Sequence, residues 1–100
     1  HPAFTMRNPN RVRALVGAYA HGNPARFHDL SGAGYTFVAD RVLELDGLNP
    51  QVAARMVAPL SRWRRYDDKR QSLMRAQLDR IQAQENLSAD VGEIVQKSLN

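Results

Sequence analysis

The sequence has no cysteine, which excludes a disulfide framework and thiolate chemistry. It has no apolar run near the roughly 20 residues that a membrane-spanning helix requires. It also lacks a sustained alternation of apolar and polar residues, the pattern that predicts strands. Its first residues show neither the basic leader nor the apolar block of a signal peptide. From these absences we expect a cytoplasmic, all-α protein that makes no contact with a membrane.

The 100 residues that are present suffice for one domain or for part of one. Hydrophobic residues make up 43% and charged residues 24%, proportions that are ordinary for a folded domain. The net charge is +4, and arginine supplies most of the basic residues, a balance that could attract nucleic acid or an acidic partner. Because the chain begins with His1 rather than methionine, we expect a segment of a longer polypeptide.

An Asn-Pro pair occurs three times, at Asn8-Pro9, Asn23-Pro24 and Asn49-Pro50. Asn can accept a hydrogen bond from a free N–H of the first helical turn, and Pro suits the first helical position because it has no N–H. Each pair therefore predicts a helix start. Later in the chain, Asp67 or Asp68 and then Ser88 are predicted to cap two further helices.

Together these signals predict helices over residues 9–20, 24–28, 35–46, 50–58 and 68–84, and a last one after Ser88. Pro59 is expected to interrupt the fourth helix, which continues as a further turn over 60–65. Short connections favour antiparallel neighbours. The prediction is an all-α fold of five to six short antiparallel helices, part of an α-helical superhelix of the HEAT or armadillo type.

Apolar residues at three-to-four spacing predict which face of each helix is buried. Gly22 is predicted to end the first helix in a left-handed conformation, and the loop 31–34 to require a positive φ angle at glycine. The predicted buried faces comprise Val12, Leu15, Val16 and Tyr19; Tyr35, Val38, Val42 and Leu45; Leu73, Met74, Leu78 and Ile81; and Val91, Ile94, Val95 and Leu99.

Neither a metal site nor a catalytic centre is predicted in this chain. The three histidines, His1, His21 and His28, are not arranged as a His-Glu-x-x-His motif, and no nucleophile elbow surrounds any serine. We therefore assign no catalytic residue and no metal ligand to these 100 residues.

Two groups of polar residues are candidates for binding. Gln51 and Arg55 lie four residues apart and share one face of the predicted helix 50–58, so they could meet carbonyl or carboxylate groups. A solvated surface pair is the other interpretation of this pattern.

The second group is the basic cluster 62–70, in which Trp63 and Tyr66 lie among arginines and a lysine. It could serve a stand-alone helical module that binds nucleic acid or an acidic protein. Alternatively, the two aromatic residues belong to the core and the arginines around them are solvated.

Several motifs together resemble the C-terminal segment of the bacterial aminopeptidase N family, the alanyl aminopeptidases of the zinc metallopeptidase class. The similarity extends over essentially all 100 residues and departs from the family in the loop 29–33 and at surface positions of the last two helices. It rests on His1 to Arg13, Asn23-Pro24 with Phe27-His28, Gly34-Tyr35, Asn49 to Ala53, Arg65 to Asp67 with Lys69 to Gln71, and Glu85 to Ser88.

The resemblance implies that residues 1–100 are a C-terminal helical domain fragment that covers a catalytic domain absent from this chain. In that family one zinc ion, held by ligands outside this segment, supports release of N-terminal amino acids from peptides. The helical domain encloses the substrate cavity, and the cavity-lining positions of the family correspond here to Arg13, Gln51 and Arg55. The expected partners are peptide substrates and the catalytic domain, without nucleic acid, and the fragment alone is expected to be inactive.

Overall fold

The computed structural model describes residues 9–100, and within this range it contains helices and no strand. The predicted all-α class is therefore confirmed. The second residue of the first Asn-Pro pair begins a helix, whereas Asn8 lies outside the described residues, as does His1. The elements are α1 (Pro9–Gly22), α2 (Pro24–Phe27), α3 (Ala33–Asp46), α4 (Pro50–Arg55), α5 (Ala58–Ser61), the 3-10 helix η1 (Trp63–Arg65), α6 (Asp68–Gln82) and α7 (Ala89–Leu99).

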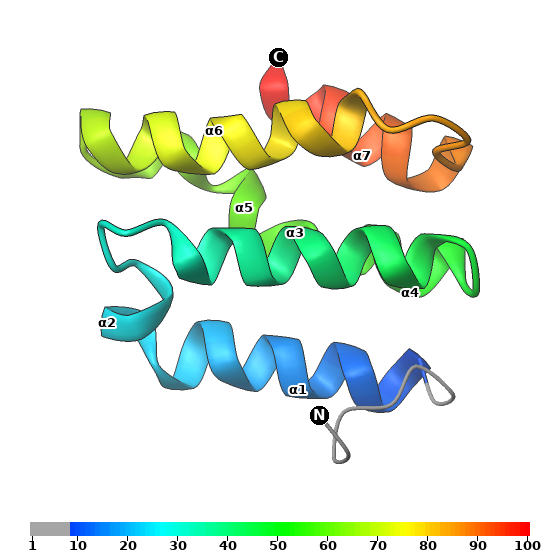
Figure 1. Cartoon of the computed structure of the whole chain (residues 1–100), viewed down its shortest axis with the longest axis horizontal. Helices are drawn as coiled ribbons and strands as arrows, with labels where there is room; N and C mark the ends of the chain where they lie inside the picture. Colours follow the sequence, from blue (N-terminus) through cyan, green and yellow to red (C-terminus); the bar gives the residue numbers. More distant parts are fainter. Residues whose placement is uncertain (1–8) are drawn as a thin grey trace.

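The helices form two rows, with α3 at the centre. Figure 1 shows α1, α3 and α6 stacked as three roughly parallel rods, with α4 behind α3 and α7 behind α6. Helix α3 packs against α1, α4 and α6, and α7 packs against α4 and α6. Helix pairs stacked on one another in this way are typical of an α-solenoid. None of the described helices combines the length and the apolarity needed to cross a membrane.

The core follows the predicted apolar faces, with one exception. Tyr35, Val38, Val42 and Leu45 of α3 are fully buried, which agrees with the central position of that helix. Leu15, predicted to be buried with the other apolar residues of α1, is instead 42% exposed. Spacing assigned it to the correct side of the helix, but its neighbours there leave an open groove rather than a packed core.

Local capping explains where three helices begin. The Asn49 side chain accepts a hydrogen bond from the backbone N–H of Val52 at 3.2 Å, the Asp67 carboxylate accepts from Arg70 at 3.2 Å, and the Ser88 hydroxyl accepts from Val91 at 3.1 Å. These predictions are confirmed. Asn23 makes no side-chain cap, however, so α2 begins at Pro24 without one.

Helix ends were predicted less well. Helix α1 continues through Gly22, which is not in the left-handed region, because the backbone N–H of Asn23 still bonds to the carbonyl of Tyr19. Helix α4 ends at Arg55 rather than near residue 58, since Pro59 has no N–H to donate to the carbonyl of Arg55. The chain then begins α5, which has Pro59 in its first turn, where no N–H is needed.

The connection between α2 and α3 depends on two glycines. Gly32 has a φ of 78°, which confirms the predicted positive φ in the loop 31–34. Gly34 lies against the backbone of Phe27, where a Cβ atom would be 2.8 Å from the Phe27 Cα and 2.9 Å from its carbonyl carbon. This close approach holds α2 against the start of α3. It therefore also fixes the position of His28, the residue that follows the end of α2.

Candidate functional site

The predicted Gln51 and Arg55 pair lies on the exposed face of α4. Val52 and Ala53 of the same helix are buried in the core, so the cap at Asn49 and the burial of these two residues determine which way the helix faces. Gln51 and Arg55 are exposed, and neither side chain makes a hydrogen bond or an ion pair with another described residue. The pair is therefore available to a partner.

Arg55 borders a cleft of about 520 Å³ between α4–α5 on one side and α7 on the other. The α7 wall contributes Asp90, Glu93 and Lys97, and Lys97 pairs with Glu93 at 3.3 Å in an exposed position. Arg55 thus lies beside a surface that contains charges of both signs. The sequence does not predict this cleft, because its two walls are far apart along the chain.

Arg13, the third predicted residue, lies on α1 next to the buried Val12 and is itself exposed. Helices α1 and α4 pack against each other, so all three predicted residues belong to two neighbouring helices. The structure gives no contact between Arg13 and either Gln51 or Arg55, and their joint role in binding stays a prediction.

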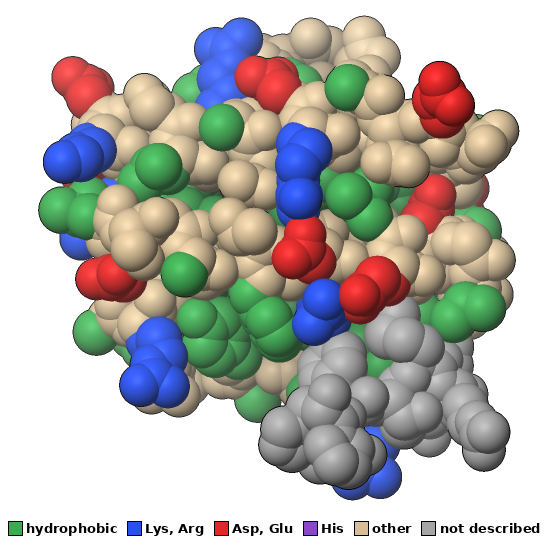
Figure 2. All heavy atoms as spheres, in the orientation of Figure 1, with side chains coloured by type: hydrophobic (Ala, Val, Ile, Leu, Met, Phe, Trp, Pro, Cys, Tyr) green, Lys and Arg blue, Asp and Glu red, His purple; other side chains and the backbone are tan. Residues whose placement is uncertain are grey.

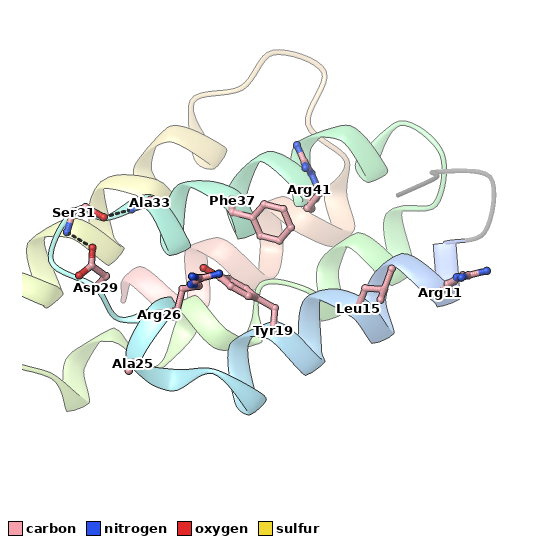
Figure 3. A pocket seen from close by; sticks show the side chains of 10 residues that line it. All are labelled: Arg11, Leu15, Tyr19, Ala25, Arg26, Asp29, Ser31, Ala33, Phe37 and Arg41. Atoms are coloured by element: carbon pink, nitrogen blue, oxygen red, sulfur yellow. Dashed lines mark hydrogen bonds between the residues drawn. The ribbon is translucent and has the colours of Figure 1, made fainter. Parts of the chain in front are cut away.

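A larger groove, of about 1090 Å³, lies between α1 and α3 (Figures 2 and 3). Leu15, Tyr19 and Phe37 form its apolar part, and Tyr19 packs edge-on against Phe37 with ring centroids 5.2 Å apart. In Figure 2 apolar side chains gather in the hollow between these two helices, with charged side chains around them. Four charged residues, Arg11, Arg26, Asp29 and Arg41, line the rest of the groove.

Asp29 is fixed at one end of this groove by its own loop. Its carboxylate accepts the backbone N–H of Ser31 at 3.3 Å, and the Ser31 hydroxyl accepts the N–H of Ala33 at 3.2 Å (Figure 3). The hydrogen bonds from Ser31 lower the pKa of Asp29, so the carboxylate is charged at neutral pH. The loop therefore places a fixed negative charge beside the apolar groove.

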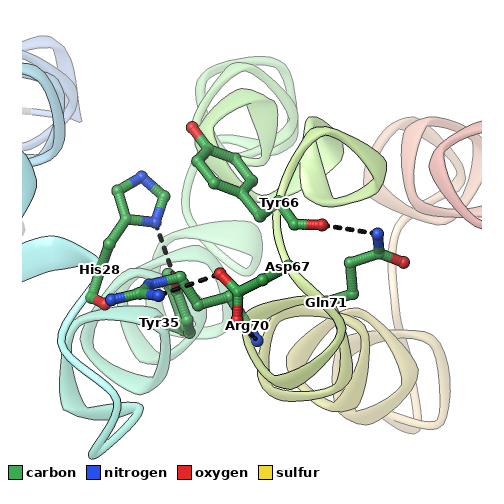
Figure 4. A network of polar contacts seen from close by, with 6 residues as sticks. All are labelled: His28, Tyr35, Tyr66, Asp67, Arg70 and Gln71. Atoms are coloured by element: carbon green, nitrogen blue, oxygen red, sulfur yellow. Dashed lines mark hydrogen bonds and ion pairs between the residues drawn. The ribbon is translucent and has the colours of Figure 1, made fainter.

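A polar network joins the α2–α3 corner to the start of α6 (Figure 4). The Arg70 side chain donates to the carbonyl of His28 at 2.8 Å and to the carboxylate of Asp67 at 2.9 Å. The His28 ring nitrogen Nδ1 and the Tyr35 hydroxyl are 2.7 Å apart. The contact of Arg70 with the His28 carbonyl joins residues 42 positions apart, so local sequence patterns do not predict it. His28 and Tyr35 are only seven residues apart, but a turn and the start of α3 separate them.

Part of the basic cluster 62–70 holds the fold together through hydrogen bonds to distant backbone carbonyls. Trp63 is only 6% exposed, and its indole N–H donates to the carbonyl of Ser98 at 2.8 Å. The Arg64 guanidinium donates to the carbonyls of Ser98 and Leu99, at 3.1 and 2.8 Å, and so caps the end of α7. The buried indole is not available to stack on a nucleic-acid base, and this favours the interpretation in which Trp63 belongs to the core.

Within residues 9–100, no group of three or more His, Cys, Asp or Glu side chains is close enough to hold a metal ion. His21 and His28 belong to different helix ends, and the residues around them do not fit a zinc site.

These features define an all-α helical-repeat domain with surface grooves, lined by apolar and charged side chains, between its stacked helices. The chain belongs to the family described as "Domain of unknown function (DUF3458_C) ARM repeats", which matches residues 1–100. The resemblance to the aminopeptidase N family and the expectation of an armadillo-like fold are both confirmed.

Curated relatives and a solved structure agree with this assignment. The chain is 58% identical over 99 residues to aminopeptidase N of Caulobacter vibrioides and 50% identical over 99 residues to aminopeptidase N of Escherichia coli. It also resembles the crystal structure of Legionella pneumophila aminopeptidase A in complex with aspartic acid, with a TM-score of 0.87 and 38% identity. Each match covers 99% of this chain, but only 12%, 11% and 11% of the respective relative.

Proposed function

We propose that this chain is the C-terminal helical part of a zinc-dependent aminopeptidase, in which it encloses the substrate cavity without contributing catalytic residues. The observation that carries the proposal is the 58% identity to aminopeptidase N across 99 residues. The chain spans only 12% of that relative and 11% of aminopeptidase N from Escherichia coli. The peptidase reaction therefore belongs to the longer polypeptide. The zinc ligands lie outside this chain, and the enzyme works in the cytoplasm on peptides.

In this role Arg13, Gln51 and Arg55 contact the peptide. Support comes from their exposure on the adjoining helices α1 and α4 and from the cleft that Arg55 borders. A guanidinium donates charge-assisted hydrogen bonds to a peptide carbonyl or C-terminal carboxylate, and an amide side chain adds a neutral one. The helices supply a rigid support, because Val52 and Ala53 anchor α4 in the core.

The test compares two substrates in the longer enzyme that contains this chain. In the Arg55→Ala variant, kcat/KM for an alanyl tripeptide is expected to fall about tenfold, the effect of losing one charge-assisted hydrogen bond. The kcat/KM for alanine p-nitroanilide, which has no peptide beyond the first residue, stays within about twofold. Arg65→Ala is the matched control, because Arg65 is exposed and carries the same charge but lies in η1, outside the cleft.

An equal loss on both substrates would contradict a contact with the peptide, and so would an equal loss in the Arg65→Ala control. A second measurement addresses the catalytic domain. The 100-residue chain alone, with or without added zinc, should not hydrolyse alanine p-nitroanilide. Turnover by this chain would refute the assignment of the chemistry to the rest of the polypeptide.

A further inference from the structure

A small pocket of about 150 Å³ lies where the end of α1, the α2 corner and the α5–η1 segment meet. Its polar lining consists of His21, His28, Arg62 and Tyr66. Among residues 9–100, no acidic side chain lines it, whereas the groove at α1 and α3 contains Asp29 and the cleft beside Arg55 contains two carboxylates. The pocket therefore differs from the others in chemical character.

The hydrogen bond between His28 and Tyr35 determines what His28 presents to this pocket. Burial raises the pKa of Tyr35 to about 12, so the phenol keeps its proton at neutral pH. The positive charge of Arg70 lies close to the phenol oxygen, which orients the hydroxyl hydrogen toward His28 Nδ1. His28 Nδ1 and the Tyr35 hydroxyl are 2.7 Å apart. With the hydroxyl hydrogen directed toward it, Nδ1 is the acceptor, and we therefore assign the ring proton of His28 to Nε2.

The donors of His28 and Tyr66 lie on one side of the network. Figure 4 shows the second ring nitrogen of His28 pointing away from Tyr35, on the side to which the Tyr66 hydroxyl also extends. The His28 and Tyr66 rings are in contact, with centroids 4.3 Å apart and planes tilted by 33°, which restricts their orientation. An imidazole N–H and a phenol O–H thereby face the same side, from two residues that line the pocket.

Positive charge at the pocket comes from the guanidinium of Arg62. His21 and Arg62 are exposed, and neither side chain makes a hydrogen bond or an ion pair with another described residue. The nearby carboxylate, Asp67, is already paired with Arg70 through both of its oxygens. The negative charge of Asp67 is therefore compensated by Arg70. The positive charge of Arg62 is not compensated by any described carboxylate.

We propose that this pocket binds a small oxyanion, held by the charge of Arg62 and by hydrogen bonds from His28 Nε2 and the Tyr66 hydroxyl. Such donors suit the oxygens of phosphate, sulfate or a carboxylate. The site uses none of the residues Arg13, Gln51 and Arg55. It stands whether or not the chain acts in a peptidase.

The experiment follows the histidine ring signals of the ¹³C-labelled 100-residue chain by NMR during addition of sodium sulfate. Sodium chloride at equal ionic strength is the reference, and sodium acetate is a second titration. The His28 signal is expected to shift along a saturation curve with sulfate and not with chloride. Arg62→Ala should weaken the apparent affinity about tenfold, and Tyr66→Phe should weaken it less, because it loses a neutral hydrogen bond. Arg65→Ala should leave the affinity unchanged.

Saturation by sulfate alone would identify a tetrahedral oxyanion such as free phosphate as the ligand, and saturation by acetate as well would admit an acidic side chain. Both results support the pocket. A shift of His28 that is linear and equal in sulfate and chloride would overturn the proposal. It would also be overturned if Arg65→Ala weakened binding as much as Arg62→Ala, since the anion would then follow the net charge rather than this pocket. Neither arginine makes a side-chain contact that the fold requires, and thermal unfolding of both variants verifies this.

Discussion

Replacement of Gly34 by alanine tests the packing of α2 on α3 most directly. The added Cβ atom would overlap the carbonyl oxygen of Phe27 and would lie within 3 Å of two further atoms of that residue's backbone. Because all three are backbone atoms, no side-chain rotation relieves the overlap. The α2 corner must move away from α3, and with it the His28 ring that bonds to Tyr35.

The size of the effect follows from two opposing contributions. Forcing an extra methyl group into a packed site costs about 1–3 kcal/mol, and contact with rigid backbone places this case at the upper end. Alanine in place of glycine within a helix returns about 0.5–1 kcal/mol. We therefore expect Gly34→Ala to lower the free energy of unfolding by about 2 kcal/mol. For a chain of this length that lowers the melting temperature by roughly 8–16 °C.

The assay is thermal unfolding of the 100-residue chain, followed by circular dichroism of its helices. Gly17→Ala is the matched control, because Gly17 is inside α1 and an added Cβ would meet nothing within 4 Å. This second variant should be more stable than the parent chain by about 0.5–1 kcal/mol. If Gly34→Ala were as stable as the parent while Gly17→Ala behaved as expected, the close approach of α2 to α3 would be refuted.

Two further predictions concern polar contacts that hold the helices together. Burial, and then the charge of Arg70, lowers the pKa of His28 below its ordinary value of 6.5, and Asp67 opposes the shift. The unfolded chain therefore binds the proton more readily than the folded chain. The stability that depends on neutral His28 is fully present above about pH 6.5 and decreases as the pH falls below it. Urea unfolding at about pH 7.5 and about pH 5 measures this, and His28→Gln should flatten the dependence. Asp46, which is 8% exposed, accepts the backbone N–H and the hydroxyl of Ser88 at 2.9 and 2.5 Å. Asp46→Asn should therefore cost about 2 kcal/mol in urea unfolding, and an unchanged midpoint would contradict this anchoring of α7 to the end of α3.

The parts of the fold that depend on neighbouring residues could be predicted from the sequence. Helix starts at Asn49, Asp67 and Ser88 were correct because each cap bonds to an N–H three residues later. Asn23 has the same local signal, but its backbone does not adopt the extended conformation of the other caps, and α1 runs almost directly into α2. A cap motif predicts a helix start only where the preceding helix has ended.

Burial of individual side chains was harder to predict, because periodicity shows the side of a helix and not what covers it. Val12 and Val16 are buried, whereas Leu15 on the same side of α1 lines the open groove. For the candidate site, spacing correctly placed Gln51 and Arg55 on an exposed face of α4. The cleft beside Arg55 could not be foreseen, since α7 supplies its second wall from about 40 residues further along the chain.

The basic cluster 62–70 shows why charge density alone does not locate a binding surface. Arg64 and Arg70 donate hydrogen bonds to the backbone carbonyls of Ser98 and His28, which are 34 and 42 residues away. Without these arginines the two carbonyls would lose these side-chain donors. Arg62 and Arg65 have the same charge but make no such side-chain contact, so they are the arginines of this cluster that can bind a partner. Substitution of Arg64 or Arg70 would therefore disturb the fold together with any binding. Only the comparison of Arg62→Ala with Arg65→Ala separates an anion held in the small pocket from attraction to the overall positive charge.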